Sequence, residues 1–347
     1  EKGVFTQDFC EDLVEGRTDM VVHSWKDLPV ESREGTEIFA TLPRADMRDL
    51  LLVKKTSWPE AQKRRVLRVF SSSPRREYNL TPFLKEALPG GFEQITFSSV
   101  RGNVQTRMQK MLDATEIDGL VVAKAAVDRL LLAEREEFTP TQVKIRKILA
   151  ECHWMILPLE ANPAAAAQGA LAIEVASARD DVKKLIKPIH CAKTFEAVNI
   201  EREILTGFGG GCHQKVGASV VTKPFGQVIF TRAFTEKTGA VATVELKATQ
   251  NPKTEKVSSS QVFPFNPSDA KWFDRKPLEA RLASGPLFVA RANGWPEGAK
   301  TAPGQVVWVS GYETWKKLAK KGIWVNGSSE SLGEEEAPAV ETLLGVK

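Results

Sequence analysis

A glycine-rich stretch that ends in a cysteine is the segment of this sequence best suited to covalent chemistry. Residues 207–211 contain four glycines, and Cys212 follows them directly. Glycine permits positive φ and close approach of another group, and a thiol can form a covalent bond. A helix is expected over residues 194–206 and a strand over 216–221, which would place Cys212 on a loop tip between rigid elements. The alternative is a buried structural thiol, the usual state of an unpaired cysteine.

A short buried strand over residues 19–24 is expected to lead into a charged turn. Ser24, Lys26 and Asp27 lie at the C-terminal end of this strand, and Pro29 ends the regular structure. Ligands of open α/β sheets bind at this end of the strands. These side chains are therefore candidates for contact with a ligand.

Cationic side chains recur at three predicted strand-to-helix junctions. Strands are expected over residues 66–71, 94–99 and 118–123, and Ser73 followed by Pro74 is a strong start signal for the first helix. Arginines gathered over positive helix ends repel one another unless an anion lies among them, and guanidinium groups match carboxylates. The pattern indicates a polyanionic ligand, with scattered surface arginines as the alternative. The junction cations are Arg75, Arg76, Arg101, Arg107, Lys124 and Arg129.

The elements that must position these residues predict an α/β protein. Strands and helices that alternate over residues 66–133 indicate a parallel sheet with right-handed crossovers. Residues 157–163 are expected to cross between lobes. The later helix, with a hairpin of strands 227–234 and 240–248, indicates an α+β domain. Beyond residue 251 only a strand at 306–309 and a helix at 313–321 stand out, and residues 334–336 form an acidic patch.

Composition restricts the class of protein. The 347 residues suffice for two or three domains, and 42% hydrophobic with 27% charged residues is ordinary for a soluble protein. A net charge of +4 and two tyrosines do not favour nucleic acid binding. No apolar run approaches the ~18 residues of a membrane span. Four distant cysteines favour a reducing cytoplasm, and their spacing from the histidines predicts no metal site.

Together these pieces resemble the hydroxymethylbilane synthase (porphobilinogen deaminase) family. The matching stretches occur in the order of the family over roughly residues 1 to 235. They are residues 2–5, 22–29, 72–76, 101–107, 168–170, 201–202 and 210–212.

The resemblance implies two periplasmic-binding-protein-like α/β lobes around a cleft, a small α+β third domain and an additional C-terminal segment. Domain one would comprise residues 1–46 and 166–190, domain two 47–165, and the cofactor-carrying domain 191–265. Residues 266–347 would be an extension. The opening strand and helix of the family would precede Lys2, so domain one is expected to lack its first strand.

The resemblance also implies an activity. Cys212 would hold a dipyrromethane cofactor through a thioether, and four porphobilinogen units would be added to this primer with loss of ammonia. Hydrolysis would then release linear hydroxymethylbilane for heme biosynthesis. Asp27 matches the catalytic carboxylate, which can relay a proton and offset developing positive charge. Binding of cofactor and substrate carboxylates would fall to Lys2, Ser24, Lys26, Ser73, Arg75, Arg76, Arg101, Gly102, Asn103, Arg107, Arg129, Gln168, Gly169 and Ala170.

Some residues depart from the family pattern, and one other function remains. Trp25 replaces a usual Met, Pro74 a usual Leu, and alanines precede Gln168. Residues 306–336 resemble part of uroporphyrinogen-III synthase, which would make this chain a piece of a fusion. The protein is expected to be a monomer in the cytoplasm, with uroporphyrinogen-III synthase as a candidate partner if it is not fused. The alternative is a non-catalytic binding protein that holds a carboxylate-rich ligand in the same cleft, although such a protein needs neither Asp27 nor Cys212.

Overall fold

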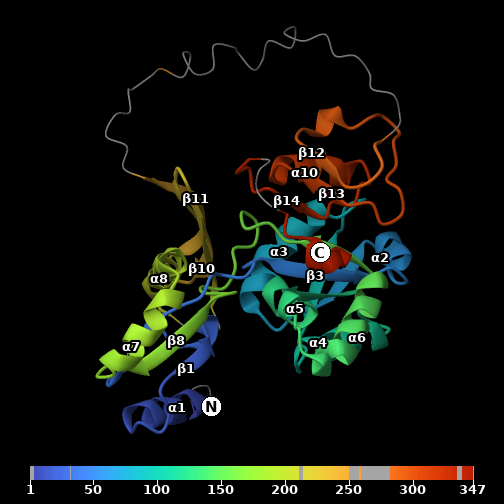
Figure 1. Cartoon of the computed structure of the whole chain (residues 1–347). Helices are drawn as coiled ribbons and strands as arrows, with labels where there is room; N and C mark the ends of the chain where they lie inside the picture. The colour runs from blue at the N-terminus through green and yellow to red at the C-terminus, as the bar shows by residue number, and fades with distance from the viewer. Residues whose placement is uncertain are drawn as a thin grey trace.

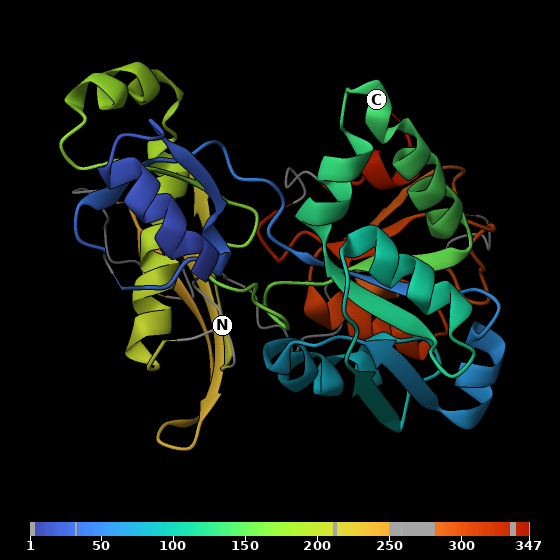
Figure 2. The same ribbon diagram turned by 90° about the horizontal axis from the view of Figure 1, so that it is seen from below.

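The computed structural model of the chain describes residues 4–31, 33–210, 214–249, 258, 282–333 and 338–346. Two bodies stand side by side in Figures 1 and 2. One holds the N-terminal helix together with α8 and the long hairpin, and the other holds the largest sheet and the C-terminal elements. Two crossing segments, residues 41–48 and 157–170, connect the bodies. The mixed α/β architecture confirms the predicted fold class.

The first lobe is built on a small antiparallel sheet in the order β1-β8-β2. Residues that lie far apart in the sequence therefore share one sheet, because β8 pairs with both other strands. On one face the His23 ring and the Thr36 hydroxyl bond to the Glu174 carboxylate, at 2.7 Å each. The elements of this lobe are α1 (Val4–Val14), β1 (Val21–Ser24), η1 (Trp25–Asp27), β2 (Thr36–Ala40), β8 (Leu171–Ala176), α7 (Asp180–Ile186) and η3 (Lys187–Ile189).

The second lobe is a five-stranded sheet in the order β5-β4-β6-β3-β7. Strand β4 runs parallel to β5 and β6, which confirms the predicted parallel unit. Strand β3 runs antiparallel to β6 and β7 and is buried along its whole length. The strands are β3 (Asp49–Lys54), β4 (Val66–Phe70), β5 (Gln94–Ser98), β6 (Gly119–Ala123) and β7 (Cys152–Ile156). The helices are α2 (Trp58–Arg64), α3 (Pro74–Ala87), α4 (Val104–Asp113), α5 (Lys124–Leu131), η2 (Glu136–Phe138) and α6 (Thr139–Ala150).

The third unit places helix α8 (Ala192–Gly207) beside an antiparallel sheet. Its strands are β9 (Lys215–Lys223), β10 (Gly226–Thr235) and β11 (Gly239–Ala248). The predicted hairpin is confirmed, with Thr235 opposite Gly239 at the turn. Helix α8 begins two residues before the predicted start and leads directly to the glycine-rich stretch.

The C-terminal segment packs onto the second lobe and shares its hydrophobic core. Trp295, Trp315 and Val309 belong to the same buried cluster as Leu51 and Phe83. The Trp315 indole also donates to the Ala87 carbonyl at 3.1 Å. The elements are β12 (Leu287–Val289), η4 (Ala292–Gly294), β13 (Val307–Val309), α10 (Tyr312–Lys320), β14 (Gly327–Ser328) and α11 (Glu341–Leu344), with a parallel sheet β12-β13-β14. The predicted strand and helix are confirmed, whereas residues 334–336 lie outside the described residues.

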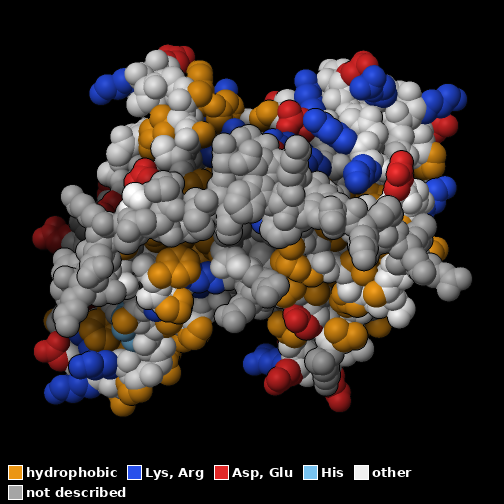
Figure 3. Space-filling model, turned by 90° about the horizontal axis from the view of Figure 1, so that it is seen from above, with side chains coloured by type: hydrophobic (Ala, Val, Ile, Leu, Met, Phe, Trp, Pro, Cys, Tyr) orange, Lys and Arg blue, Asp and Glu red, His pale blue; other side chains and the backbone are white. Residues whose placement is uncertain are grey.

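Charged side chains of both signs lie on the face that carries this C-terminal sheet. Figure 3 shows Lys and Arg side chains next to Asp and Glu on that face, with hydrophobic side chains between the groups. One acidic residue of the segment is buried instead. The Glu330 carboxylate accepts from the Leu159 amide at 2.9 Å and the Glu160 amide at 3.4 Å. The C-terminal segment thereby holds the start of the second crossing, residues 157–170, which we call the return crossing.

We expect replacement of Glu330 by glutamine to change how stability depends on pH. Burial raises the pKa of Glu330 from 4.5 to about 7, although Arg48 and the two amides oppose the rise. Between these values the folded state keeps a proton that the unfolded chain releases. The stability from this group is therefore full below about pH 4.5 and falls as the pH rises to 7. Urea unfolding of the wild type should show this fall, by up to about 3 kcal/mol, and Glu330→Gln should lack it.

The exposed Glu297 provides the matched control, because a Glu297→Gln variant changes the same chemical group on the surface of the same segment. This variant should keep the wild-type dependence on pH. An unchanged dependence in Glu330→Gln would show that the buried carboxylate does not titrate in this window.

Candidate active site

Trp25 anchors the turn that carries Asp27. Trp25 is 1% exposed and packs with Leu28, Ala170 and Val198. Its amide donates to the Ala170 carbonyl at 3.1 Å. The substitution of Trp for the usual Met is thus accommodated in a core, while Ser24 and Asp27 remain exposed. A fixed turn with an exposed carboxylate can hold and move a proton at a defined place.

Charged residues of both lobes act on the ammonium group of Lys26. Burial lowers the pKa of Lys26, the Asp27 charge raises it, and the Arg76 charge lowers it again. Asp49 and Arg75 act on the same ammonium group with smaller effects. Since Lys26 and Asp27 lie on η1 and the other three residues belong to the second lobe, these groups form one charged cluster between the lobes.

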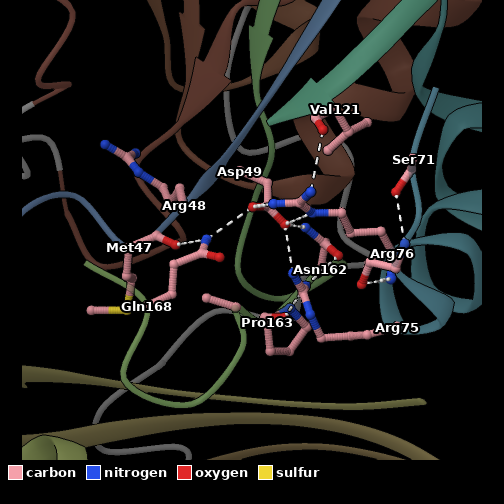
Figure 4. A network of polar contacts seen from close by, with 12 residues as sticks. Met47, Arg48, Asp49, Ser71, Arg75, Arg76, Val121, Asn162, Pro163 and Gln168 are labelled. Carbon is pink, nitrogen blue, oxygen red and sulfur yellow. Dashed lines mark hydrogen bonds and ion pairs between the residues drawn. The ribbon is translucent and has the colours of Figure 1, made fainter. Parts of the chain in front are cut away.

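The first turn of α3 turns two arginines toward a carboxylate that the sequence did not single out. Ser73 caps this helix, since its hydroxyl accepts from the Arg76 amide at 3.4 Å. Arg75 and Arg76 are buried, at 4% and 9% exposure, and both donate to Asp49, which is fully buried. Figure 4 shows the guanidinium groups of both arginines directed at Asp49. Burial alone would raise the pKa of Asp49, but Arg76 and Arg75 outweigh it and hold the pKa far below its usual range.

The segment 168–170 joins the same cluster. The Gln168 amide nitrogen donates to Asp49 at 2.9 Å and to the Met47 carbonyl at 2.7 Å, so both of its N–H bonds are used within the protein. Gly169 has φ of +84°, and a Cβ there would lie 2.6 Å from the Ala45 carbonyl oxygen. Only glycine allows the two crossings to touch at this point. The Ala170 carbonyl holds the Trp25 turn, as described above.

The second junction contributes one further cation to the cluster. Arg107 donates to the Gly102 carbonyl at 2.6 Å, and its pKa is lowered by burial and then by the Arg76 charge. Asn103 caps α4 by accepting from the Thr106 amide at 2.8 Å. Gly102 has φ of +121°, and a Cβ there would clash with Thr106. Arg101 is exposed.

The third junction places its cation differently. Lys124 is 1% exposed, and its ammonium pairs with Asp128 at 2.5 Å and Asp46 at 3.6 Å. The hydroxyl of Thr342 from the C-terminal segment also donates to Asp128, at 2.6 Å. Lys124 is therefore neutralised within the fold, while Arg129 is exposed.

Two of the predicted site residues lie outside the described residues. They are Cys212, predicted to attach the cofactor, and Lys2, predicted to bind cofactor or substrate, so both roles stay predictions. Just before Cys212, Gly209 and Gly210 have φ of +96° and +66°. These values explain why glycine is needed there. Within the described ranges, no group of three or more His, Cys, Asp or Glu side chains could hold a metal ion.

Comparison with known proteins decides the family. A family model described as "Porphobilinogen deaminase, dipyromethane cofactor binding domain" matches residues 1–184, more than half of the chain. The chain belongs to the porphobilinogen deaminase family. Two curated porphobilinogen deaminases illustrate the similarity. The protein from Burkholderia orbicola is 34% identical and that from Chromobacterium violaceum 33%, over 70% and 66% of this chain and 67% and 70% of theirs.

Other matches are shorter or more distant. Against the Syntrophomonas wolfei porphobilinogen deaminase, 34% identical, the chain spans 62% of the relative and 63% of itself. A solved structure described as a putative periplasmic sulfonate-binding protein from Methylobacillus flagellatus KT has 13% identity and a TM-score of 0.29. That alignment covers 58% of this chain and 53% of the other. With a TM-score this low, the alignment says nothing about the fold or the function of this chain.

Asp49, the carboxylate at the centre of the charged cluster, was not predicted from the sequence. Asp49 heads the strand Asp49–Lys54, and an acidic residue at the start of an unbroken apolar run was the available signal. The amide of Asn162 in the return crossing was also missed, and it donates to Asp49 at 3.0 Å.

Proposed function

We propose that this chain is a hydroxymethylbilane synthase, a transferase that joins four porphobilinogen units on a cysteine-linked primer and hydrolyses the product to linear hydroxymethylbilane. The observation that carries this proposal is the buried cluster in which Arg75 and Arg76 donate to Asp49, within range of the charge of Lys26 from the first lobe. Family membership and the exposed carboxylate of Asp27 support it.

The charge of this cluster fits a dipyrromethane with its acetate and propionate groups. Lys26, Arg76 and Arg107 lie close enough for Arg76 to lower the pKa of the other two, after burial. Such mutually repelling cations are stabilised by carboxylates. When bound through Cys212, the dipyrromethane supplies the primer for chain growth.

The chain's own residues would divide the work by position. We assign proton transfer to Asp27, because its carboxylate is exposed beside the cationic cluster. The residues that would bind cofactor and substrate carboxylates are Lys2, Ser24, Lys26, Ser73, Arg75, Arg76, Arg101, Gly102, Asn103, Arg107, Arg129, Gln168, Gly169 and Ala170. We further assign a monomeric, cytoplasmic state, with residues 306–336 derived from a fused uroporphyrinogen-III synthase. Among the described residues, no helix is long and apolar enough to span a bilayer.

Intact mass spectrometry tests the proposal most directly. The wild type and a Cys212→Ala variant would be purified from a host that makes porphobilinogen, with Cys191→Ala as a matched control. We expect an added mass of two linked pyrrole units on the wild type and the control, a positive aldehyde colour reaction for pyrroles, and neither in Cys212→Ala. An unmodified wild type that still binds a carboxylate-rich pyrrole without consuming it would favour the non-catalytic binding protein.

A further inference from the structure

Asp49 lies where four donor side chains of the charged cluster converge. It is the first residue of β3, and its carboxylate has no exposed surface. Side chains from α3 and from the return crossing point toward it in Figure 4. The donors are Arg75 Nη2 at 2.8 Å, Arg76 Nε at 3.0 Å, Arg76 Nη2 at 2.7 Å, Asn162 Nδ2 at 3.0 Å and Gln168 Nε2 at 2.9 Å.

These contacts fix the plane of the Arg76 guanidinium. Its Nε and Nη2 donate to the two different oxygens of Asp49, and its Nη1 donates to the Val121 carbonyl at 3.2 Å. A bidentate pair adds geometric specificity to the attraction between the charges. Arg76 is thereby held in one orientation beside Lys26 and Arg107.

Arg75 ties the same carboxylate to the return crossing. Its Nη1 donates to Asn162 Oδ1 at 3.0 Å and to the Pro163 carbonyl at 2.6 Å, while its Nη2 donates to Asp49. Asn162 donates back to Asp49, so the first turn of α3 and the crossing are locked by one group. A shift of Asp49 would move both.

The charges around Asp49 are only partly balanced. Asp49 and Asp27 lie among Lys26, Arg75 and Arg76, which leaves an excess of one positive charge, and Arg76 also acts on Arg107. A buried cation whose partner is removed is strongly destabilised. Asp49 therefore offsets enough charge to keep both arginines buried, while the excess remains available to an anion.

We infer that Asp49 is a positioning residue, which orients Arg76 and Arg75 so that the cluster binds the carboxylates of the pyrrole chain. Only the identity of the ligand rests on the proposed function. The positioning of the arginines by Asp49 does not depend on it. Two separate measurements follow from this distinction.

The first measurement is the reactivity of the Lys26 amine. In Asp49→Asn, Lys26 loses a negative neighbour and still faces two guanidinium groups, so more of it is unprotonated. A trace of an amine-reactive ester, followed by peptide mass spectrometry, should label Lys26 several-fold faster than in the wild type. The exposed Lys184 serves as the internal reference.

Asp118→Asn is the matched control variant. Asp118 is also buried, at 1% exposure, and pairs with Arg64, but it precedes β6 at the end opposite to Asp49. Both variants should lose stability. Only Asp49→Asn should change Lys26 labelling, and only Asp49→Asn should raise KM for porphobilinogen, by about tenfold or more and by more than it lowers kcat.

Equal Lys26 labelling in folded wild type and folded Asp49→Asn, judged by circular dichroism, would overturn the inference. A wild type without any turnover would instead count against the proposed function, and the labelling comparison would still judge Asp49. If Asp49→Asn does not fold, Asp49→Glu keeps the charge but moves the carboxylate by one methylene. That variant should label normally at Lys26 and raise KM, and a normal KM would overturn the inference.

Discussion

Replacement of Asp27 by asparagine is expected to lower turnover of porphobilinogen by about 10²- to 10⁴-fold, the usual contribution of a positioned general acid or base. Asparagine has nearly the same shape but cannot exchange a proton or carry a negative charge. Because Asp27 is exposed and the turn is anchored by Trp25, the fold should be unaffected. The variant should still carry the mass of the dipyrromethane.

Steady-state product formation and intact mass, measured on the same preparation, check this expectation. Glu31→Gln is the control, because Glu31 is an exposed acid four residues further along the same loop. It should retain the turnover of the wild type. Near-normal turnover in Asp27→Asn would remove Asp27 from the proposed mechanism, whatever its effect on cofactor mass.

The sequence predicted the junctions of the second lobe well, because their signals are local. Ser73 and Pro74 define the start of α3 through a hydrogen bond and a fixed φ, and neither depends on the rest of the chain. The three parallel strands follow from their alternation with helices. Strand β3 was not predicted, since its residues enter the middle of the sheet antiparallel to β6 and only tertiary pairing reveals it.

The direction of side chains at these junctions was beyond sequence reasoning. Arg75 and Gln168 were predicted to bind a ligand, and their roles toward it stay predictions, but the structure turns their amide and guanidinium donors toward Asp49. Whether a guanidinium faces a cleft or a buried carboxylate depends on a partner more than 25 residues away. Lys124 illustrates the same point, since Asp46 and Asp128 neutralise it.

The docking of the C-terminal segment was also not predicted. Its strand and helix were visible as local patterns, but the surface they cover was not. Trp315 and Trp324 mark the covered surface, because each indole donates to a carbonyl of the second lobe. Trp315 donates to the Ala87 carbonyl and Trp324 to the Trp154 carbonyl. A buried indole usually finds such a partner, although Trp25 Nε1 has none, and the partner is a long-range property.

The largest stability change is expected for Glu201→Gln, which should cost about 3–5 kcal/mol. Glu201 has no exposed surface and accepts from Arg44 Nη1 at 2.6 Å and Nη2 at 2.8 Å. It also accepts from the Ala167 and Val220 amides, at 2.8 Å each. One carboxylate of α8 thus ties both crossings and β9 together. A glutamine would leave the Arg44 guanidinium without its countercharge in a buried site.

Urea unfolding of Glu201→Gln and Glu203→Gln separates this effect from a change in helix propensity. Glu203 lies two residues further along α8 and is exposed, so its replacement should shift stability by less than about 0.5 kcal/mol. Similar midpoints for the two variants would contradict the role of the buried pair. Because α8 leads into the glycine-rich stretch before Cys212, a folded Glu201→Gln protein should also carry less cofactor mass than Glu203→Gln. Loss of the tie to both crossings would then reach Cys212, the proposed attachment residue, along the chain that follows α8.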